Sequence, residues 1–590
     1  MKLPILVSIL VGANASLACS SPTPGPVATP PSDVVPVLEH PREAAGLRKD
    51  GEARTADLRK DGEAWTADLR KDGEAWTADL RKDGEAWTAG PRSGEATLFL
   101  MADIRGILRP CGCTVELQKG GFDRLIPYLA EERKHHPGGA LLHAGPLFYE
   151  DAKPDAKKKE QRERQAAYTA DLVAQTGIVI AGATATDQVG SGGKLGALAE
   201  RAKIQITAAN LSRAGDATPS ESVIKEIGGL RIGIFALASP EDLVDSGDNA
   251  TKVSDPEVAA TTALTSLRKR SDVVVLLSGL GLRETKRLVR KVAGIDFAVA
   301  GGMGEHPAYS EEAELVGSTR VMQFHREGRY IGRLSLRVVN GDLQFVDASE
   351  VSPGELAQLD ERVKRLEGAL ADLTRTRHPT DPEIASMNHH LASVKDSRDR
   401  LAGKKVIIPE GRSSFSFTIT PLDWDLPQDP KIAELMKAFD DELAKINIAN
   451  AGTLPAALPG QATFVGSEAC FECHEETRAF WKTNEHAHAW TTLVEAGKTF
   501  DIDCVSCHVT GYGMAGGALV GQTKGREAVQ CEACHGPGSK HVEDSLATSI
   551  LAKPTEASCV GCHNQHHSPR FKFGSFREHL LVPGHGRPLN

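Results

Sequence analysis

Four copies of a Cys-x-x-Cys-His motif constrain this chain more than any other feature of its sequence. Two thiols at this spacing reach the two vinyl groups of one porphyrin from a single turn, and the adjacent imidazole binds its iron. Paired cysteines also build closed zinc sites, but zinc does not require a histidine directly after every pair. The motifs therefore predict four haem c groups, with thioether bonds to Cys470, Cys473, Cys504, Cys507, Cys531, Cys534, Cys559 and Cys562 and proximal iron ligands at His474, His508, His535 and His563.

The same segment offers further histidines as second axial ligands, which a six-coordinate haem needs. They are His486, His488, His541, His566, His567, His579 and His585. Because they outnumber the irons, some of them are expected to be ordinary surface residues. The haems must also supply much of the apolar interior, since about 130 residues that carry four porphyrins cannot build an ordinary side-chain core.

The order and flanks of the motifs resemble the cytochrome c554 family of tetrahaem proteins. The matching frames run from "GSEACFECH" through "WKTNEHAHAW" and "CEACHGPGSKH" to "FREHLLVPGH" and span Phe464 to His585. The resemblance implies electron transfer between closely packed haems. By position in the family pattern it implies distal ligands at His486, His541 and His585, with His579 as the rival for the last, and one haem that can be five-coordinate.

The N-terminus has the pattern of an export signal, as haem attachment outside the bacterial cytoplasmic membrane requires. In "MKLPILVSILVGANASLACSS" one lysine precedes an apolar run, and small residues follow. Cys19 is the predicted lipidation site, although Ser16 stands where leucine is usual; ordinary cleavage after Ala15 or Ala18 is the alternative. No later apolar run approaches the roughly 18 residues that span a bilayer. The expected location is the periplasm, or the outer membrane through a lipid anchor, of a Gram-negative bacterium.

A long spacer follows the signal. The Pro-rich stretch "SPTPGPVATPPSDVVP" precedes four nearly identical eleven-residue units that begin at Leu47, Leu58, Leu69 and Leu80. Eleven residues make three helical turns, so a helical stalk is conceivable. Each unit contains a glycine, which costs about 1 kcal/mol inside a helix, and offers little apolar surface. An extended tether without chemistry is therefore the preferred interpretation.

Short apolar runs alternate with helical stretches from Ala96 to about Val346, which predicts an α/β layered fold. The runs include "TLFLMAD", "ALLHAG", "GIVIAG", "LRIGIFAL", "DVVVLLSG" and "YIGRLSLRVV". With frames such as "ADIRG", "GGFDRL" and "IDFAVAGGMG", they resemble the calcineurin-like metallophosphoesterases of the 5′-nucleotidase branch. The resemblance implies a sandwich with functional loops at the strand ends.

That family uses two metal ions to activate water against a phosphoester, but the expected ligands are missing here. Asp103 on the first strand is kept, whereas Arg105 replaces the histidine that should accompany it. The remaining ligand positions align with Pro146, Ala183, Thr184, Gly279, Gly302 and Gly304. We therefore expect the domain to be catalytically dead as a dimetal phosphoesterase. A smaller metal site is the alternative, and its ligands would be Asp103 with His143, His306 or His325.

Two apolar stripes with three-four spacing follow, separated by "HPTDP" at 378–382. They predict an antiparallel helical hairpin, and a spacer within the chain is the preferred role, with pairing to a partner as the alternative. The predicted order is a signal peptide at 1–19, a spacer at 20–93, the phosphoesterase-like domain at 94–350, the hairpin at 351–405, a connector at 406–460 and a mostly α multihaem domain at 461–590. The connector is expected to contain one further helix, around 430–445.

Cys111 and Cys113, in "RPCGCTVELQKGG", belong to none of these motifs. They follow the first-strand loop, where the vanished metal site would open. One interpretation is a local disulfide or a pair of inert thiols. The other is a redox-active dithiol in the same oxidising compartment as the haems. Proteins that resemble this one keep a Cys-Gly-Cys or selenocysteine variant there, which favours redox use.

Three functions from different classes remain. The preferred one is an exported multihaem electron carrier whose α/β domain is a scaffold or docking module, with redox proteins of the cell envelope as partners. The second is a haem enzyme that binds a small nitrogen species at a five-coordinate haem. The third is a bifunctional hydrolase of the 5′-nucleotidase type. The formal net charge of -10 argues against a nucleic-acid partner.

Overall fold

The computed structural model describes residues 92–110, 119–153, 155–215, 219–244, 246–302, 309–349, 353–376, 382–402, 407–546, 550–564, 568 and 571–587. The chain divides into two compact units, 1–66 and 67–590, and all described residues belong to the second. The export signal, the spacer and its repeats, the lipidation site Cys19, the Cys111 and Cys113 pair, and His306 lie outside the described residues. What the sequence predicts for them stays a prediction.

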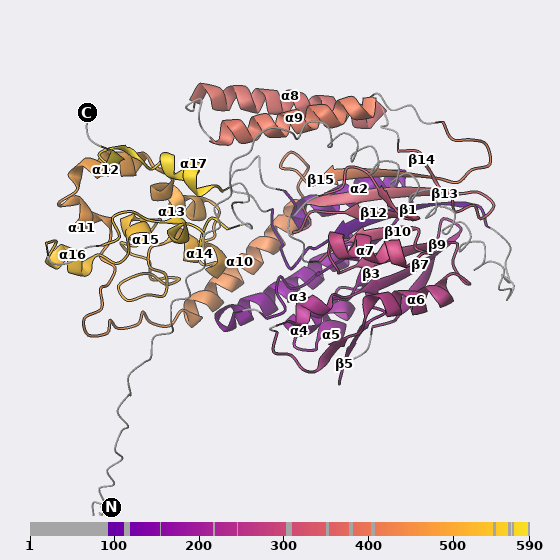
Figure 1. Cartoon of the computed structure of the whole chain (residues 1–590), viewed down its shortest axis with the longest axis horizontal. Helices are drawn as coiled ribbons and strands as arrows, with labels where there is room; N and C mark the ends of the chain where they lie inside the picture. Colours follow the sequence, from indigo (N-terminus) through magenta and orange to yellow (C-terminus); the bar gives the residue numbers. More distant parts are fainter. Residues whose placement is uncertain are drawn as a thin grey trace, which may run out of the picture. The chain divides into compact units, whose positions relative to one another are not determined.

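Seven strands form the first sheet (Figure 1). In spatial order they are β14 (Val346–Asp347), β15 (Ser414–Pro421), β13 (Tyr330–Val338), β1 (Gly94–Ala102), β2 (Ala140–Ala144), β3 (Ile178–Gly182) and β4 (Gln205–Thr207). From β1 to β4 the strands run parallel, whereas β13 is antiparallel to β1. The carboxyl ends of β1, β2 and β3 therefore lie at one edge of the sheet.

Six strands form the second sheet. In spatial order they are β11 (Glu314–Val316), β12 (Thr319–Gln323), β10 (Phe297–Ala300), β9 (Val273–Ser278), β7 (Leu230–Leu237) and β6 (Ser222–Ile227). The central strands run parallel, and β6 and β11 are antiparallel to their neighbours. A separate pair consists of β5 (Leu211–Arg213) and β8 (Thr251–Val253).

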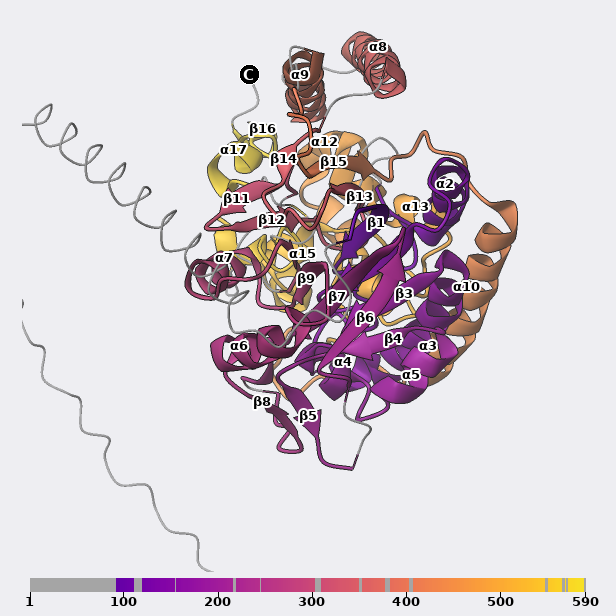
Figure 2. The ribbon, with the colours of Figure 1, turned by 90° about the vertical axis from the view of Figure 1, so that its right-hand side faces the viewer.

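The two sheets pack face to face because alternate residues of their strands are apolar. Leu98 and Leu100 of β1 belong to the cluster between the sheets, while Phe99 and Met101 belong to a cluster on the opposite face. Helices cover both outer faces: α2 (Phe122–His135), α3 (Lys159–Thr176), α5 (Leu195–Arg201) and α10 (Pro430–Asn450) on one, α6 (Pro256–Leu267) and α7 (Leu282–Lys291) on the other. Figure 2 shows the sheets between these helices. The predicted α/β layered fold is confirmed.

Part of the segment predicted as a connector, 406–460, belongs to this fold. β15 pairs with β13 along its whole length, from Ser414 opposite Arg337 to Pro421 opposite Tyr330. The predicted helix is α10, whose apolar face joins the same cluster as Phe99. The α/β domain therefore reaches past the predicted boundary at 350. The reason is that the chain leaves the first sheet after β14, forms the helical hairpin and then returns to the sheet as β15, which lies between β14 and β13.

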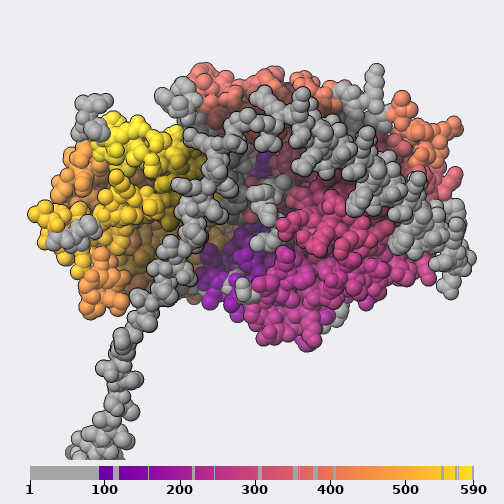
Figure 3. Space-filling view, viewed as in Figure 1, coloured from indigo at the N-terminus to yellow at the C-terminus, as the bar shows by residue number. Residues whose placement is uncertain are grey.

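The helical hairpin consists of α8 (Pro353–Thr376) and α9 (Pro382–Ala402). Its two predicted stripes meet in a small apolar cluster of Val363, Leu366, Met387, Leu391 and Val394. Ion pairs join Glu367 to Lys395 and Asp360 to Arg398, which fixes the antiparallel direction. The hairpin forms part of the molecular surface in Figure 3. The two apolar stripes thus pack against each other within one chain, as predicted.

The C-terminal region is built from short helices and turns. The helices are α11 (Ser467–Phe471), α12 (Glu475–Thr483), α13 (Glu485–Glu495), α14 (Ile502–His508), α15 (Cys531–His535), α16 (Ser539–Glu543) and α17 (Phe573–Glu578), with a 3-10 turn η4 (Glu556–Ser558) and a small pair of strands, β16 (Val582–Pro583) and β17 (Gly586–Arg587). Its mostly α character is as predicted. Within the described part of the chain, every helix is too short or too polar to cross a membrane.

Candidate functional site

A cavity of about 3570 Å³ extends along the C-terminal region, and residues of the α/β domain and of the helical hairpin also line it. Its walls include all eight cysteines and all four histidines of the Cys-x-x-Cys-His motifs. The structure therefore brings the predicted thioether and proximal ligand residues to one space, although the motifs are spread over more than 90 residues of sequence. A large hollow lined by thiols and imidazoles has the donor set that haem c needs.

Short helices present the motifs to the cavity. α14 carries Cys504, Cys507 and His508, and α15 carries the whole third motif. Residues three apart lie on the same side of a helix, so both thiols of a motif can reach one porphyrin. The carboxylate of Asp501 caps α14 by accepting the backbone N–H of Asp503. The first turn of this motif helix is thus fixed by its own sequence.

Three of the motif histidines are hydrogen-bonded through Nδ1. His508 bonds the carbonyl of Ala489 at 2.5 Å, His535 bonds that of Leu551 at 2.7 Å, and His563 bonds the hydroxyl of Ser568 at 3.1 Å. A neutral imidazole that donates through Nδ1 presents the lone pair of Nε2 to a metal. Because carbonyl oxygens only accept hydrogen bonds, the surrounding chain orients His508 and His535 for ligation through Nε2.

Two candidate distal histidines lie opposite motif histidines. The ring centres of His486 and His563 are 6.0 Å apart, and those of His535 and His585 are 6.2 Å apart. Two metal–nitrogen bonds of about 2 Å each place two imidazole centres about 6 Å apart across one metal ion. Both pairs thus have the spacing of two axial ligands. His541 on α16 and His579 after α17 also line the cavity.

Cysteines of different motifs lie close together. The thiol groups of Cys470 and Cys531 lie close enough to affect each other's pKa, as do those of Cys507 and Cys562. Burial, followed by the neighbouring Cys559 thiol, raises the pKa of Cys534 to about 11. The first motif therefore neighbours the third, the third neighbours the fourth, and the fourth neighbours the second. This order differs from the order in the sequence.

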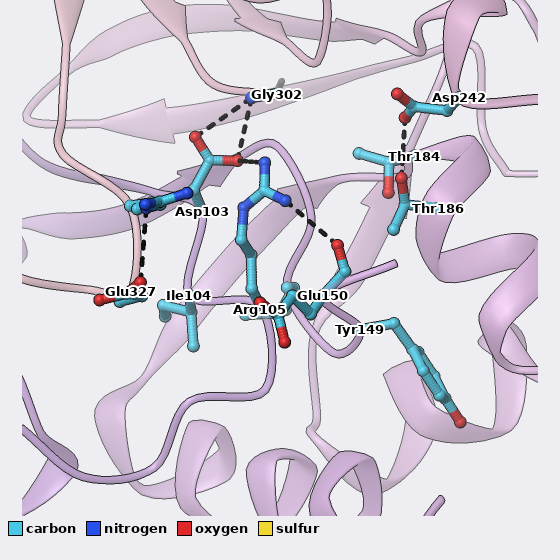
Figure 4. A network of polar contacts seen from close by, with 12 residues as sticks. Asp103, Ile104, Arg105, Tyr149, Glu150, Thr184, Thr186, Asp242, Gly302 and Glu327 are labelled. Carbon is cyan, nitrogen blue, oxygen red and sulfur yellow. Dashed lines mark hydrogen bonds and ion pairs between the residues drawn. The ribbon is translucent and has the colours of Figure 1, made fainter. Parts of the chain in front are cut away.

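A buried polar pocket around Asp103 lies at the end of β1, and Figure 4 shows its contacts. The carboxylate of Asp103 accepts the backbone N–H of Gly302 at 2.9 Å and pairs with Arg105 Nη2 at 3.3 Å. Arg105 Nη1 donates to the carbonyl oxygen of Glu150 at 3.1 Å. The side chains of Asp103 and Arg105 are both nearly fully buried. An internal cation thus faces the buried carboxylate of Asp103.

The backbone around this ion pair is strained and tightly packed. Asp103 and Arg105 have φ values of 53° and 56°, which are unusual for residues with a side chain. A Cβ atom on Gly145 would lie 2.3 Å from Asp103 Oδ1, and one on Gly302 would lie 2.1 Å from the carbonyl oxygen of Gly279. Glycine at these two positions lets the strand-end loops approach the carboxylate.

Asp187, which the sequence analysis did not single out, organises the neighbouring loop. Its carboxylate accepts the backbone N–H groups of Leu147, Phe148 and Tyr149 at 2.8 to 2.9 Å. It follows Thr184, the N-cap of α4 (Ala185–Gly190), whose hydroxyl accepts the Asp187 N–H. The pattern Thr-x-x-Asp before a helix was the available sequence signal. The loop that begins at Pro146 is therefore held by hydrogen bonds to a carboxylate.

Burial sets the protonation of the ionisable groups in this pocket. Burial raises the pKa of Asp103 to about 6 against the opposing effect of Arg105, and raises the pKa of Asp242 to about 6 against the Thr186 hydroxyl. Burial and Arg105 lower the pKa of His143 to about 3. The Nε2 atom of that neutral ring accepts the backbone N–H of Ile104 at 3.3 Å.

The alternative metal site is not assembled from the residues that the structure describes. Among them, no three His, Cys, Asp or Glu side chains are grouped to hold a metal ion. Its described candidates were Asp103, His143 and His325. His143 bonds backbone, and His325 packs near the ring of Tyr330.

The comparisons with known proteins agree with a division of the chain into two kinds of structure. Residues 469–536 match the family described as cytochrome c554 and c-prime, a stretch that contains the first three motifs. Cytochrome c-554 of Nitrosomonas europaea is 36% identical over 98 residues, which cover 14% of this chain and 42% of that protein. The chain thus spans less than half the length of this relative. The match supports a multihaem cytochrome with haem c as its cofactor.

Solved structures similar to the chain include phosphoesterases and nucleotidases. The calcineurin-like phosphoesterase YfkN of Bacillus subtilis is 11% identical, with 60% of this chain and 98% of that chain covered and a TM-score of 0.38. A 5′-nucleotidase precursor of Thermus thermophilus is 15% identical, with 68% of each chain covered and a TM-score of 0.39. The C-terminal region is similar to the cytochrome c554 family, and the α/β domain is similar to the calcineurin-like phosphoesterases.

Proposed function

We propose that the protein is an exported c-type cytochrome that binds four haems and transfers electrons. One observation carries this proposal: a single cavity is lined by every cysteine and histidine of the four motifs. Haem bound there supplies one-electron chemistry. The protein supplies the thioether cysteines, the axial imidazoles and the surrounding charge.

The axial ligands follow from the ring pairs. His486 with His563 and His585 with His535 each have the spacing of two ligands on one iron, which supports the fourth and third motifs as bis-histidine sites. His541 and His579 remain candidates for the other two motifs. A site without a second histidine would be five-coordinate, so the spin state of the iron decides whether the haem-enzyme alternative survives.

The spatial order of the motifs supports a path for electrons. The proximity of Cys470 to Cys531 and of Cys562 to Cys507, with the electrostatic influence of Cys559 on Cys534, favours the order first, third, fourth, second. The first and second motifs would then be the two ends of the path. Redox proteins of the cell envelope are the proposed partners at these ends.

The α/β domain is proposed to lack metal-dependent hydrolysis. What supports this is the buried guanidinium of Arg105, which is bonded to Asp103 on one side and to the Glu150 carbonyl on the other. A divalent metal at Asp103 would have to displace that cation. The proposal fails if the purified protein binds a divalent metal stoichiometrically and hydrolyses a nucleotide or related ester.

Export and lipidation rest on the N-terminal sequence. The run before Cys19 and the need to attach haem outside the cytoplasmic membrane support an exported protein. Cys19 is the proposed lipid anchor, and the repeats would then hold the folded part away from the membrane. Cys111 and Cys113 are retained as a proposed redox dithiol, which a Ser substitution at either position would test through the number of electrons taken up.

A reductive titration of the full-length protein, produced in a bacterium that matures c-type cytochromes, tests the electron-transfer proposal. We expect one electron per haem, hence four per chain from the haems, with the two ring-paired sites low-spin in both oxidation states. A chain that carries no covalently bound haem, or haems that take up no electrons at accessible potentials, would refute it.

A further inference from the structure

The α/β domain contacts the second haem motif through two cations at the start of α3. Lys158 Nζ lies 2.6 Å from Asp503 Oδ1. Arg162, one helical turn later, pairs with both carboxylate oxygens of Asp503, at 2.9 and 3.2 Å. Asp503 immediately precedes Cys504 on α14. The carboxylate that stands next to Cys504 in the sequence is therefore paired with two cations of the α/β domain.

Buried amides hold the same junction in place. Gln161 donates from Nε2 to Asp501 and Asp503, both at 3.0 Å. Asn447 of α10 donates from Nδ2 to Gln161 at 2.7 Å and to the carbonyl of Phe500 at 3.0 Å. Gln161 and Asn447 are 1% and 3% exposed. Because such amides bond in few geometries, the cations on α3 are fixed relative to α14.

The loop of the former metal pocket supports Arg162 from the other side. Glu150 Oε2 lies 2.9 Å from Arg162 Nη2, and the Glu150 carbonyl accepts Arg105 Nη1. Asp187 fixes the residues before Glu150 through backbone N–H groups. The strand-end loop that would carry a bridging metal ligand thus carries a counter-ion for the interdomain contact.

These charges border the haem cavity. Lys158, Arg162 and Asp503 line the same cavity as Cys504 and Cys507, together with Glu150 and Asp501. The side chain of Arg162 is 11% exposed, and that of Asp503 is 25% exposed. Charges with so little contact with water act over longer distances than surface charges do.

We propose that the α/β domain sets the reduction potential of the haem attached to Cys504 and Cys507, by holding Arg162 and Lys158 against Asp503. This inference rests on the proposed haem attachment. Reduction of a ferric to a ferrous haem adds one electron and neither makes nor breaks a bond. Positive charge at the cavity wall therefore favours the reduced form, and an uncompensated carboxylate favours the oxidised form.

A charge series on the full-length haem-loaded protein tests the proposal by spectroelectrochemical titration. Arg162→Gln leaves Asp503 less compensated, and one component of the titration should shift to lower potential. Lys158→Gln should shift the same component in the same direction but less, because Arg162 still pairs with both oxygens. Asp503→Asn should shift that component to higher potential, and Arg162→Gln with Asp503→Asn should return it toward the wild-type value.

The matched control is Arg164→Gln. Arg164 lies on the same helix and pairs with Glu442 on the surface, 51% exposed and away from the cavity lining. This substitution removes the same positive charge as Arg162→Gln and should leave the potential of every titration component unchanged. If Arg162→Gln loses haem, the other two variants still test the proposal. Lys158→Gln should lower the potential of the affected component, and Asp503→Asn should raise it.

The failures of the two proposals are distinguishable. Absence of covalent haem from the wild-type protein refutes the proposed function. Full haem content with no shift in the Arg162 and Asp503 variants, or shifts of both in the same direction, refutes electrostatic control by the α/β domain. A merely structural role of Arg162 would not produce shifts of opposite sign.

Discussion

The α/β domain and the C-terminal region form their interiors in different ways. In the first, alternate strand residues and helix faces fill two apolar clusters of its own and most of a third, which also takes in Leu493, Phe500 and Val505 of the C-terminal region. In the second, the cysteines and histidines of the four motifs line a cavity of about 3570 Å³, whose walls also include residues of the α/β domain and of the helical hairpin. The comparison contrasts a domain with a self-sufficient side-chain core and a region in which the proposed haems would supply much of the interior. Folding of the C-terminal region should therefore depend on haem, and folding of the α/β domain should not.

Removal of one attachment pair tests that difference with the largest expected effect. Cys504→Ser with Cys507→Ser should yield a protein with one haem fewer than wild type. Its C-terminal region should lose protection from amide hydrogen exchange around α13 and α14, because part of the cavity is left unfilled. The strands of the α/β domain should keep wild-type protection. Equal loss of protection in both regions would break the distinction.

Removal of the internal cation of the α/β domain should have the next largest effect. Arg105→Leu leaves the Asp103 carboxylate buried without its partner and should destabilise the domain by about 3 kcal/mol. Hydrogen exchange in β1 and β7 reports the local free energy of unfolding. The control is Arg201→Leu, which breaks an exposed pair with Asp171 and should cost less than about 1 kcal/mol. Similar losses from the two variants would show that Arg105 has no special role.

The pH dependence of the α/β domain should reflect both Asp103 and Asp242, since burial raises the pKa of each to about 6, and Asp242 allows its share to be tested without breaking the pair with Arg105. Burial raises the pKa of the Asp242 carboxyl from its ordinary value of 3.8 to about 6, so the folded state binds more protons than the unfolded state between these pH values. The stabilising contribution is fully present below about pH 4 and is lost as the pH rises through 6, and it amounts to at most about 3 kcal/mol. Asp242→Asn should flatten this part of the stability profile. An unchanged profile would contradict the assignment.

The smallest expected effect on stability concerns α10, the helix that joins the two regions. Asp429 caps α10 by accepting the N–H groups of Lys431 and Ile432, and Asp429→Ala should cost about 1 kcal/mol. Asp441→Ala on the same helix breaks only an exposed pair with Lys437 and should cost less than about 0.5 kcal/mol. Thermal unfolding of the intact protein should rank the two variants in this order. The reverse order would show that the cap does not hold the helix.

Local pattern was enough to predict the haem motifs, the strands from β1 to β3 and the hairpin stripes, because each is encoded within a few turns of chain. The return of β15 to the first sheet was not predictable, since its partner β13 precedes the whole hairpin. The pairing of Arg162 with Asp503 joins residues 341 positions apart. The ring pairs of His486 and His585 likewise depend on how the short helices surround the cavity. Sequence alone named these histidines but could not assign each to an iron.

The mass of the intact mature chain is the most direct test of the central claim, that all four motifs of the C-terminal region hold covalently bound haem. The protein should be produced at full length in a bacterium that matures c-type cytochromes and measured under denaturing conditions, where only covalent groups remain. The account predicts a mass equal to the mature chain, with any N-terminal lipid, plus four haems. A mass that corresponds to fewer haems in a fully matured sample would contradict it.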